Sequence, residues 1–285
     1  MKRKRKDHTP LVLRFIRWWF PKAEKIAPGF AARYFRKIFF TPLRYKIPDK
    51  ETPLMQSAVK FSVKLNGTQH IQGYQWGAGA PVLLLHGWAG RATQFRKIIP
   101  ALTKAGYQAI AFDGPVHGQS EGRQTNILEF GDAIQQVYDL YRPVAMIAHS
   151  FGGVAAIYAC TQGLPLKKLV TIASPSIADE VINTYLRAIN GSAPTGVAFR
   201  KYLLSRYGRT FEEFSSLHLV KHLKQPLQLL IVQDEDDKEV IPAHGTALKA
   251  AYPSAVLYQT NGLGHTRILR DENVIARSIE FIRQG

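Results

Sequence analysis

Cysteine and metal-ligand clusters are nearly absent from this sequence. Of its 285 residues only one is a cysteine, Cys160, which excludes a disulfide within the chain and is typical of a protein from a reducing compartment. We expect Cys160 to be a small buried apolar residue. No group of histidines and cysteines has the spacing of a metal site, so no metal is expected.

Long apolar runs are also missing. The most apolar stretch near the N-terminus, Leu11–Phe20, is short and is interrupted by Arg14 and Arg17, which argues against a transmembrane helix. The same charges, with no convincing cleavage site after them, argue against a secretory signal peptide. The expected location is therefore the cytoplasm, either free or as a peripheral protein on the inner face of the membrane.

Acidic residues are few relative to basic ones. The chain has 21 Asp and Glu against 38 Lys and Arg, a net charge of +17. Residues 1–50 hold 15 of the basic and 3 of the acidic residues, whereas residues 51–285 have a net charge of only +5. With 46% hydrophobic residues, the chain can bury one substantial core. We therefore expect a basic N-terminal extension over 1–50 and a single domain over 51–285.

The extension combines a basic run, Met1–Lys6, with the pattern of two amphipathic helices. Thr9 and Pro10 are typical of a helix start, and Pro21 is expected to end that helix. A second helix is predicted over Ala31–Phe40. Each helix has a basic face opposite an aromatic, apolar face. In the first helix the basic face holds Arg14 and Arg17, and the apolar face holds Leu11, Val12, Phe15, Trp18 and Trp19.

Two arrangements of these helices fit the pattern. Either the helices pack on the domain, or residues 1–40 bind the surface of an anionic membrane. The basic run alone could bind nucleic-acid phosphates non-specifically, but no specific nucleic-acid partner is expected.

Apolar strand-like segments and helical segments alternate through residues 51–285. This alternation favours an α/β domain with a mostly parallel central sheet flanked by helices. Residues 57–77 alternate around Asn66 and Gly67, a pattern that predicts a hairpin. Helical patterns fill residues 176–225, between two predicted strands, and indicate an insertion into the domain.

A serine follows one of the predicted strands directly. The apolar run 143–147 leads into Ala148, His149 and Ser150, and Gly152 and Gly153 come next. A tight turn from strand to helix exposes such a serine above a sheet, and it requires small residues because neighbouring backbones approach closely. The order of residues around Ser150 is therefore that of a nucleophile elbow.

An acidic cluster and a histidine follow two later strands. The run 227–233 ends at Asp234, Asp236 and Asp237, and the run 255–260 is followed by His265. Because the carboxyl ends of parallel strands lie at one edge of a sheet, these residues can meet Ser150. Serine needs a histidine to take its proton and a carboxylate to orient that histidine.

Two more motifs follow predicted strands, Leu-Leu-Leu-His-Gly-Trp at 83–88 and Ala-Phe-Asp-Gly-Pro-Val-His-Gly-Gln-Ser at 111–120. With these four motifs in this order, residues 57–285 resemble the serine-nucleophile, esterase/lipase-like branch of the α/β-hydrolase superfamily. The resemblance implies the α/β-hydrolase fold with a helical cap insertion at about 176–225. Such a cap would line the acyl or leaving-group pocket with residues such as Phe199, Tyr202, Leu203 and Phe214.

The resemblance also assigns roles to single residues. By it, Ser150 is the nucleophile, His265 is the general base, and the backbone N–H groups of Trp88 and Phe151 form the oxyanion hole. The spacing of Asp237 between Asp234 and Val240 matches the family pattern for the acid. Asp237 is favoured on that ground, and Asp234 and Asp236 stay as alternatives.

These assignments predict a serine hydrolase that cleaves a carboxylic ester, thioester or related small-molecule acyl compound and needs no cofactor. Three other functions use the same sequence features. An acyltransferase would pass the acyl group to an alcohol or amine, and a C–C bond hydrolase would use the same triad. A non-catalytic, membrane-associated binding protein on a hydrolase scaffold is the third, because a fold alone does not establish an activity.

Overall fold

The computed structural model describes residues 11–284, and these fall into two compact units. One unit combines residues 11–39 with residues 178–211, and the other combines residues 40–177 with residues 212–284. The basic run Met1–Lys6 and the predicted helix start at Thr9 and Pro10 lie outside the described residues.

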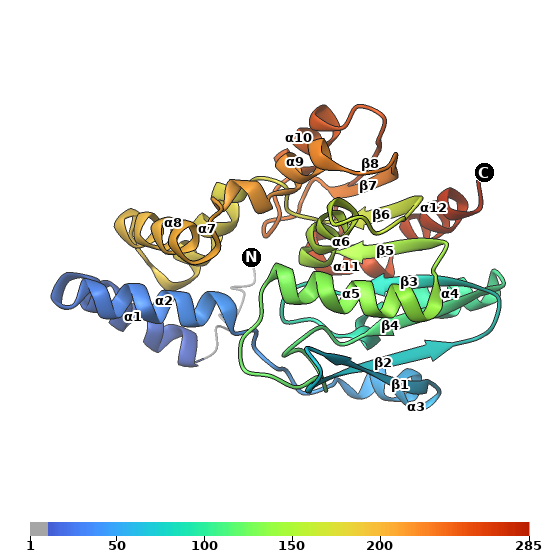
Figure 1. The fold of residues 1–285 in the computed structure, drawn as a ribbon, viewed down its shortest axis with the longest axis horizontal. Coiled ribbons are helices and arrows are strands. Elements are labelled where there is room, and N and C mark those ends of the chain that lie inside the picture. Colours follow the sequence, from blue (N-terminus) through green and yellow to red (C-terminus); the bar gives the residue numbers. More distant parts are fainter. Residues whose placement is uncertain (1–10, 285) are drawn as a thin grey trace, which may run out of the picture. The chain divides into compact units, whose positions relative to one another are not determined.

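The second unit is built on an eight-stranded sheet with the order β1-β2-β4-β3-β5-β6-β7-β8 (Figure 1). The strands β3 to β8 are parallel, and β1 and β2 form an antiparallel hairpin at one edge. The predicted hairpin is confirmed, with Asn66 and Gly67 at positive φ in its turn. The strands are β1 Val59–Leu65, β2 Gln69–Trp76, β3 Ala80–Leu85, β4 Tyr107–Phe112, β5 Ala145–His149, β6 Lys168–Ile172, β7 Gln228–Asp234 and β8 Val256–Thr260.

Helices cover both faces of this sheet, which explains why its central strands are apolar throughout. Residues of α4 (Ile98–Lys104) and α12 (Glu272–Arg283) share one core with alternate residues of the strands. On the opposite face α5 (Ile127–Tyr141) packs against α6 (Phe151–Thr161) (Figure 1). The remaining helices of this unit are α3 Thr52–Gln56, α9 Ser216–Leu219, α10 Ala243–Ala251 and α11 Gly264–Arg267. This layering confirms the predicted α/β-hydrolase architecture.

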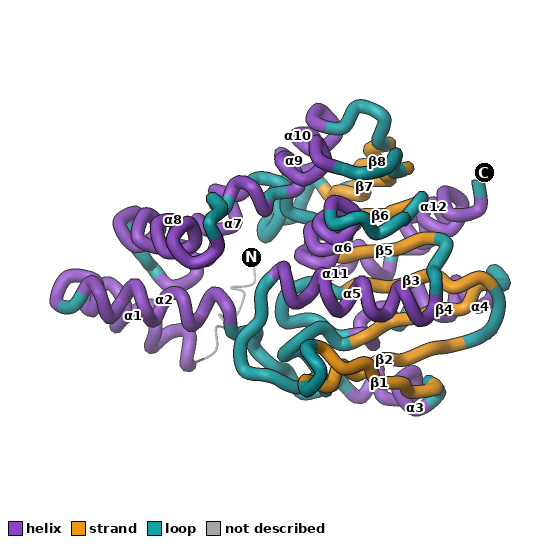
Figure 2. The backbone as a smooth tube through the Cα atoms, viewed as in Figure 1, coloured by secondary structure: helices purple, strands orange, loops and turns teal. Residues whose placement is uncertain are grey.

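The first unit is helical (Figure 2). It joins α1 (Leu11–Ile26) and α2 (Pro28–Phe40, of which residues 28–39 belong to this unit) to α7 (Ala178–Ile189) and α8 (Ala193–Tyr207). The last two helices come from the insertion predicted at 176–225. The aromatic rings of Phe35 and Phe39 lie 5.2 Å and 4.5 Å from that of Phe199. The N-terminal helices therefore share a core with the insertion.

The predicted end of the first helix at Pro21 is wrong, because α1 continues through Pro21 to Ile26. A proline inside a helix has no N–H for the carbonyl four residues earlier, which here is that of Arg17. The side-chain amide of Asn190 donates to this carbonyl at 3.3 Å and replaces the missing partner. The second helix also begins earlier than predicted, at Pro28, whose fixed φ suits a first helical turn.

Among the residues that the structure describes, no helix is both long enough and apolar enough to cross a membrane.

Candidate active site

Ser150 occupies the turn between β5 and α6, with φ 51° and ψ −125°. Positive φ is costly for a residue with a Cβ atom and persists only where the surroundings enforce it. Here the backbone N–H of Ser150 donates to the carbonyl of Ile172 at 2.9 Å, and its carbonyl accepts from the hydroxyl of Ser174 at 3.0 Å. These contacts with β6 and the residues after it hold the turn in place.

The glycines next to Ser150 are required by close backbone approach. A Cβ atom on Gly152 would lie 2.5 Å from the carbonyl oxygen of Leu85, and one on Gly87 would lie 2.8 Å from the Cβ of Ser150. The loop after β3 therefore runs directly against the turn that carries Ser150. The predicted elbow geometry accounts for both glycines.

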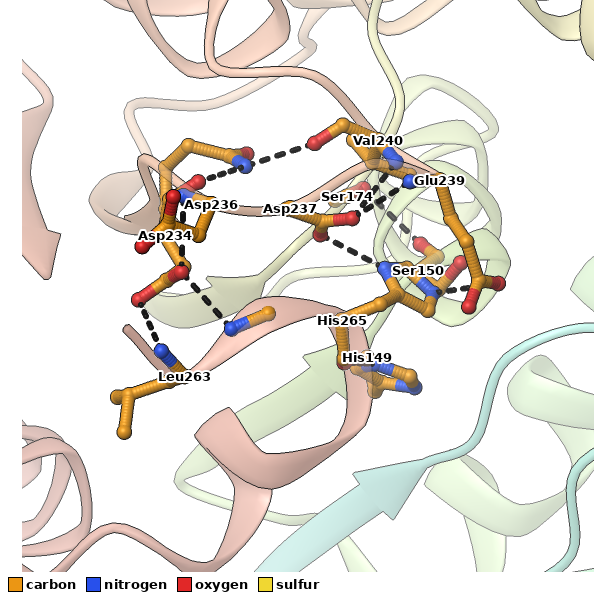
Figure 3. A network of polar contacts seen from close by, with 12 residues as sticks. His149, Ser150, Ser174, Asp234, Asp236, Asp237, Glu239, Val240, Leu263 and His265 are labelled. Atoms are coloured by element: carbon orange, nitrogen blue, oxygen red, sulfur yellow. Dashed lines mark hydrogen bonds and ion pairs between the residues drawn. The ribbon is translucent and has the colours of Figure 1, made fainter. Parts of the chain in front are cut away.

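His265 and Asp237 are hydrogen-bonded to each other. His265 Nδ1 lies 2.8 Å from Asp237 Oδ2, and the side chain of Asp237 is fully buried. The second oxygen of Asp237 accepts from the backbone N–H groups of Glu239 and Val240, both at 2.9 Å. Since the carboxylate accepts the Nδ1 proton, the lone pair of the imidazole is on Nε2. Figure 3 shows the hydrogen bond that joins Asp237 to His265, and it draws Ser150 with its contact to Ser174.

The other two carboxylates of the acidic cluster contact backbone rather than His265. The fully buried Asp234 accepts from the N–H groups of Leu263 and Gly264 and from the hydroxyl of Thr260. Asp236 accepts from the N–H of Gly262 at 2.8 Å. Burial alone would raise the pKa of Asp234, but the hydrogen bonds from Gly264, Thr260 and Leu263 outweigh it and lower that pKa. Asp234 and Asp236 thus fix the loop that carries His265.

Trp88 and Phe151 lie together at the same end of the sheet. Their rings are 5.2 Å apart and nearly perpendicular. Phe151 is the first residue of α6, where a backbone N–H has no partner within the helix. The structure therefore places Asp237 in contact with His265, and Trp88 in contact with Phe151, the residue that follows Ser150.

Comparison with known proteins agrees with this geometry. Residues 80–267 match the profile of the alpha/beta hydrolase fold family. The chain belongs to that family. A human serine hydrolase-like protein is 33% identical over 153 residues, which cover 49% of this chain and 73% of that protein. An uncharacterized hydrolase of Bacillus subtilis is 24% identical over 242 residues, covering 69% of this chain and 87% of that protein.

Solved structures show the same hydrolase fold. The esterase Pf2001 of Pyrococcus furiosus superposes with a TM-score of 0.64 at 21% identity, covering 85% of this chain and 96% of that one. A thioesterase domain from the curacin biosynthetic pathway superposes with a TM-score of 0.59 at 18% identity, covering 80% of this chain and 99% of that one.

The hydrolase motif after β4 is a buried scaffold beneath the site. Asp113 accepts from the backbone N–H groups of Ala92 and Gln119, and His86 Nε2 accepts from that of Gly114. Burial lowers the pKa of His86 well below its ordinary value, and it lowers that of His117 to about 4. His86 and His117 are therefore neutral in neutral solution.

Two contacts of His265 were not predicted from the sequence. His149 Nε2 lies 2.9 Å from the carbonyl oxygen of His265, and Gln94 Nε2 lies 3.3 Å from His149 Nδ1. The exposed carboxylate of Glu239 comes within 4.0 Å of His265 Nε2. The position of His149 next to Ser150 was the only sequence signal for the first contact, and Glu239 resembled an ordinary surface charge.

Three other residues that the sequence analysis named, Cys160, Phe199 and Leu203, are buried side chains. Cys160 is buried, as expected, and burial raises the pKa of its thiol to about 12. Phe199 and Leu203 are buried in the helical unit, where Phe199 contacts Phe35 and Phe39. Within residues 11–284, no three His, Cys, Asp or Glu side chains are grouped as a metal site.

Proposed function

We propose that this alpha/beta hydrolase is a serine hydrolase that cleaves a carboxylic ester, thioester or related acyl compound. The observations that carry this proposal are the hydrogen bond between His265 and Asp237, 2.8 Å long, and the positive φ of Ser150 in the turn after β5. A serine hydroxyl is a weak nucleophile until a base takes its proton, and this arrangement supplies an oriented base.

In the proposed reaction Ser150 Oγ attacks the carbonyl carbon of the substrate while His265 Nε2 takes the hydroxyl proton. The carbon–oxygen or carbon–sulfur bond then breaks, and the leaving group receives that proton. Water then attacks the acyl carbon while His265 Nε2 takes a proton from it, the bond from that carbon to Ser150 Oγ breaks, and Oγ receives the proton as the acid leaves. Asp237 keeps the imidazole oriented and stabilises its positive charge in each step.

The developing negative charge on the carbonyl oxygen needs donors that are already in position. The backbone N–H groups of Trp88 and Phe151 are the proposed donors, because Phe151 begins α6 and Trp88 follows the glycine packed against Ser150. The names of the similar proteins, which include a serine hydrolase-like protein, an esterase and a thioesterase, support the same reaction class.

The test is a panel of p-nitrophenyl esters of increasing acyl length, with the wild-type chain and the Ser150→Ala variant. The wild-type chain should hydrolyse at least one ester, and Ser150→Ala should lose roughly a factor of 10⁴ or more in kcat. Hydrolysis that Ser150→Ala retains in full would refute the proposal. Addition of alcohol and amine acceptors to the same assay distinguishes hydrolysis from acyl transfer by its products.

A further inference from the structure

One side of α1 presents large apolar side chains to solvent. Leu11, Phe15 and Trp18 follow each other at helical spacing and share one face, and Ile26 continues it. With Val12 and with Phe30 of α2 they form a set that we call the apolar stripe. These six residues are between 55% and 84% exposed. Exposed apolar patches of this kind mark interaction sites in folded proteins.

The opposite side of α1 already has its partners within the helical unit. Phe20 is fully buried, Arg17 Nε donates to the carbonyl of Ala188 at 2.9 Å, and Glu24 accepts from the backbone and hydroxyl of Ser192. Because the polar residues Arg17 and Glu24 bind inside the unit, the orientation of α1 is fixed. The stripe is therefore not part of the core of its own unit.

The charge around the stripe is positive. Residues 11–39 and 178–211 contain twelve Lys and Arg against three Asp and Glu, a net charge of +9. Arg14, Lys22 and Lys25 are exposed on α1, and Lys22 Nζ lies 3.5 Å from the ring centre of Trp18. Glu24, which is the acidic residue of α1, is on the packed side.

We propose that the apolar stripe, together with Arg14, Lys22 and Lys25, is a docking surface for an anionic lipid bilayer. The helix would lie in the plane of the interface, with the stripe among the acyl chains and the basic groups at the lipid headgroups. Each basic residue near an anionic surface strengthens the attraction to it, and lysine extends its ammonium group toward the headgroups. Lipid binding by this surface requires no catalytic activity, so this proposal does not depend on the proposed hydrolase function.

Charge distinguishes this partner from two others. A second copy of the chain seated on the stripe would bring two helical units of net charge +9 together, which is unfavourable. A nucleic acid would neutralise the basic groups but would leave Leu11, Phe15 and Trp18 in water. An anionic bilayer satisfies both the charge and the apolar surface.

The experiment is co-sedimentation of the full chain with vesicles of phosphatidylcholine alone and of phosphatidylcholine mixed with phosphatidylglycerol. We expect binding to the mixed vesicles and at least roughly tenfold weaker binding to the neutral ones. The double variant Phe15→Gln/Trp18→Gln keeps the charge of the chain, including that of residues 1–10, and should bind the mixed vesicles roughly tenfold more weakly. Arg14→Glu/Lys25→Glu should lose binding as well.

Matched controls come from the other unit. Leu140→Gln removes an apolar side chain of similar exposure from α5, and Lys221→Glu/Lys224→Glu makes the same charge change as Arg14→Glu/Lys25→Glu. Both controls should bind like the wild-type chain, and circular dichroism of every variant verifies folding. Absence of wild-type binding, or full binding by Phe15→Gln/Trp18→Gln, would overturn the proposal. If the wild-type chain binds no vesicles but forms concentration-dependent dimers, and Phe15→Gln/Trp18→Gln does not form them, the apolar stripe would instead bind a second copy of the chain.

Discussion

The Nε2 atom of His149 lies 2.9 Å from the carbonyl oxygen of His265. This contact joins the residue before Ser150 to the loop that carries the proposed general base, across 116 positions of sequence. A carbonyl oxygen only accepts, so His149 Nε2 is the donor in this contact. Burial, followed by the nearby His265, lowers the pKa of His149 to about 3, so its imidazole is neutral in neutral solution.

Replacement of His149 by leucine should lower kcat. Leucine fills a similar volume but donates no hydrogen bond, so the His265 loop is free to move relative to Ser150. Small displacements of a catalytic group reduce rates by up to about 100-fold. We expect a loss of roughly 10- to 100-fold in kcat for His149→Leu and a smaller loss for His149→Gln, which keeps an N–H donor. Equal kcat values for the His149→Leu variant and the wild-type chain would show that the contact does not position His265.

Replacement of each of the three aspartates of the acidic cluster by asparagine should affect kcat and stability differently. Asp237→Asn should lower kcat by roughly 10³- to 10⁴-fold, because the amide presents the wrong partner to His265 Nδ1. Asp234→Asn should mainly lower the free energy of unfolding, by about 1–3 kcal/mol, since its buried carboxylate accepts several hydrogen bonds. Asp236→Asn should have the smallest effect on both. Steady-state kinetics and urea unfolding of the three variants separate these outcomes, and a larger kcat loss for Asp236→Asn than for Asp237→Asn would reassign the acid.

The buried histidines predict that stability falls in mild acid. The pKa values of His86, His117 and His149 are lowered on folding from an ordinary value of 6.5, so the unfolded chain binds protons that the folded chain does not. The stability that depends on these neutral imidazoles is complete above pH 6.5 and is lost as the pH falls toward the folded pKa, by about 2 kcal/mol each for His117 and His149 at about pH 5. The raised pKa of Asp113, caused mainly by burial, has the opposite sign and partly offsets this loss at lower pH. Urea unfolding at about pH 7.5 and about pH 5 measures the difference, and equal stabilities would contradict the prediction.

The carboxylate of Glu239 should favour substrates with a cationic leaving group. A leaving group must approach His265 Nε2 to receive its proton, and Glu239 Oε2 lies 4.0 Å from that atom. A thiocholine ester and its neutral 3,3-dimethylbutyl analogue have the same shape and differ in charge. Glu239→Gln should reduce the ratio of their kcat/KM values by roughly two- to fivefold, the modest size expected of an exposed charge. Lys238→Met is the neighbouring control, and an unchanged ratio in Glu239→Gln would exclude this role.

The sequence predicts the sheet and the elbow well because both depend on local pattern. Apolar strands must be buried on both faces, and Gly152 must be small because the backbone of Leu85 lies against it. The choice of Asp237 came from the resemblance, because its spacing matches the family pattern, and the structure brings that residue, rather than Asp234 or Asp236, into contact with His265.

Features that depend on contacts between residues far apart in the sequence could not be predicted from local pattern. The helix through Pro21 is possible because Asn190, 173 positions from Arg17, donates to the carbonyl that the proline leaves unpaired. The buried side of α1 includes Arg17 and Glu24, whose partners Ala188 and Ser192 belong to the insertion. A helical projection of α1 alone groups Phe15 and Trp18 on an apolar face without showing what covers that face, and in the structure both residues are 60% exposed.

Labelling with a fluorophosphonate probe tests the central claim most directly, because the probe reacts with a serine only when a base has activated it. The wild-type chain, Ser150→Ala, His265→Ala and, as a control at an exposed serine, Ser254→Ala would be labelled in parallel, with folding verified by circular dichroism. We predict labelling of the wild-type chain and of Ser254→Ala, and none of Ser150→Ala or His265→Ala. A folded wild-type chain that is not labelled, or a Ser150→Ala chain that is, would contradict the assignment of Ser150 as the nucleophile.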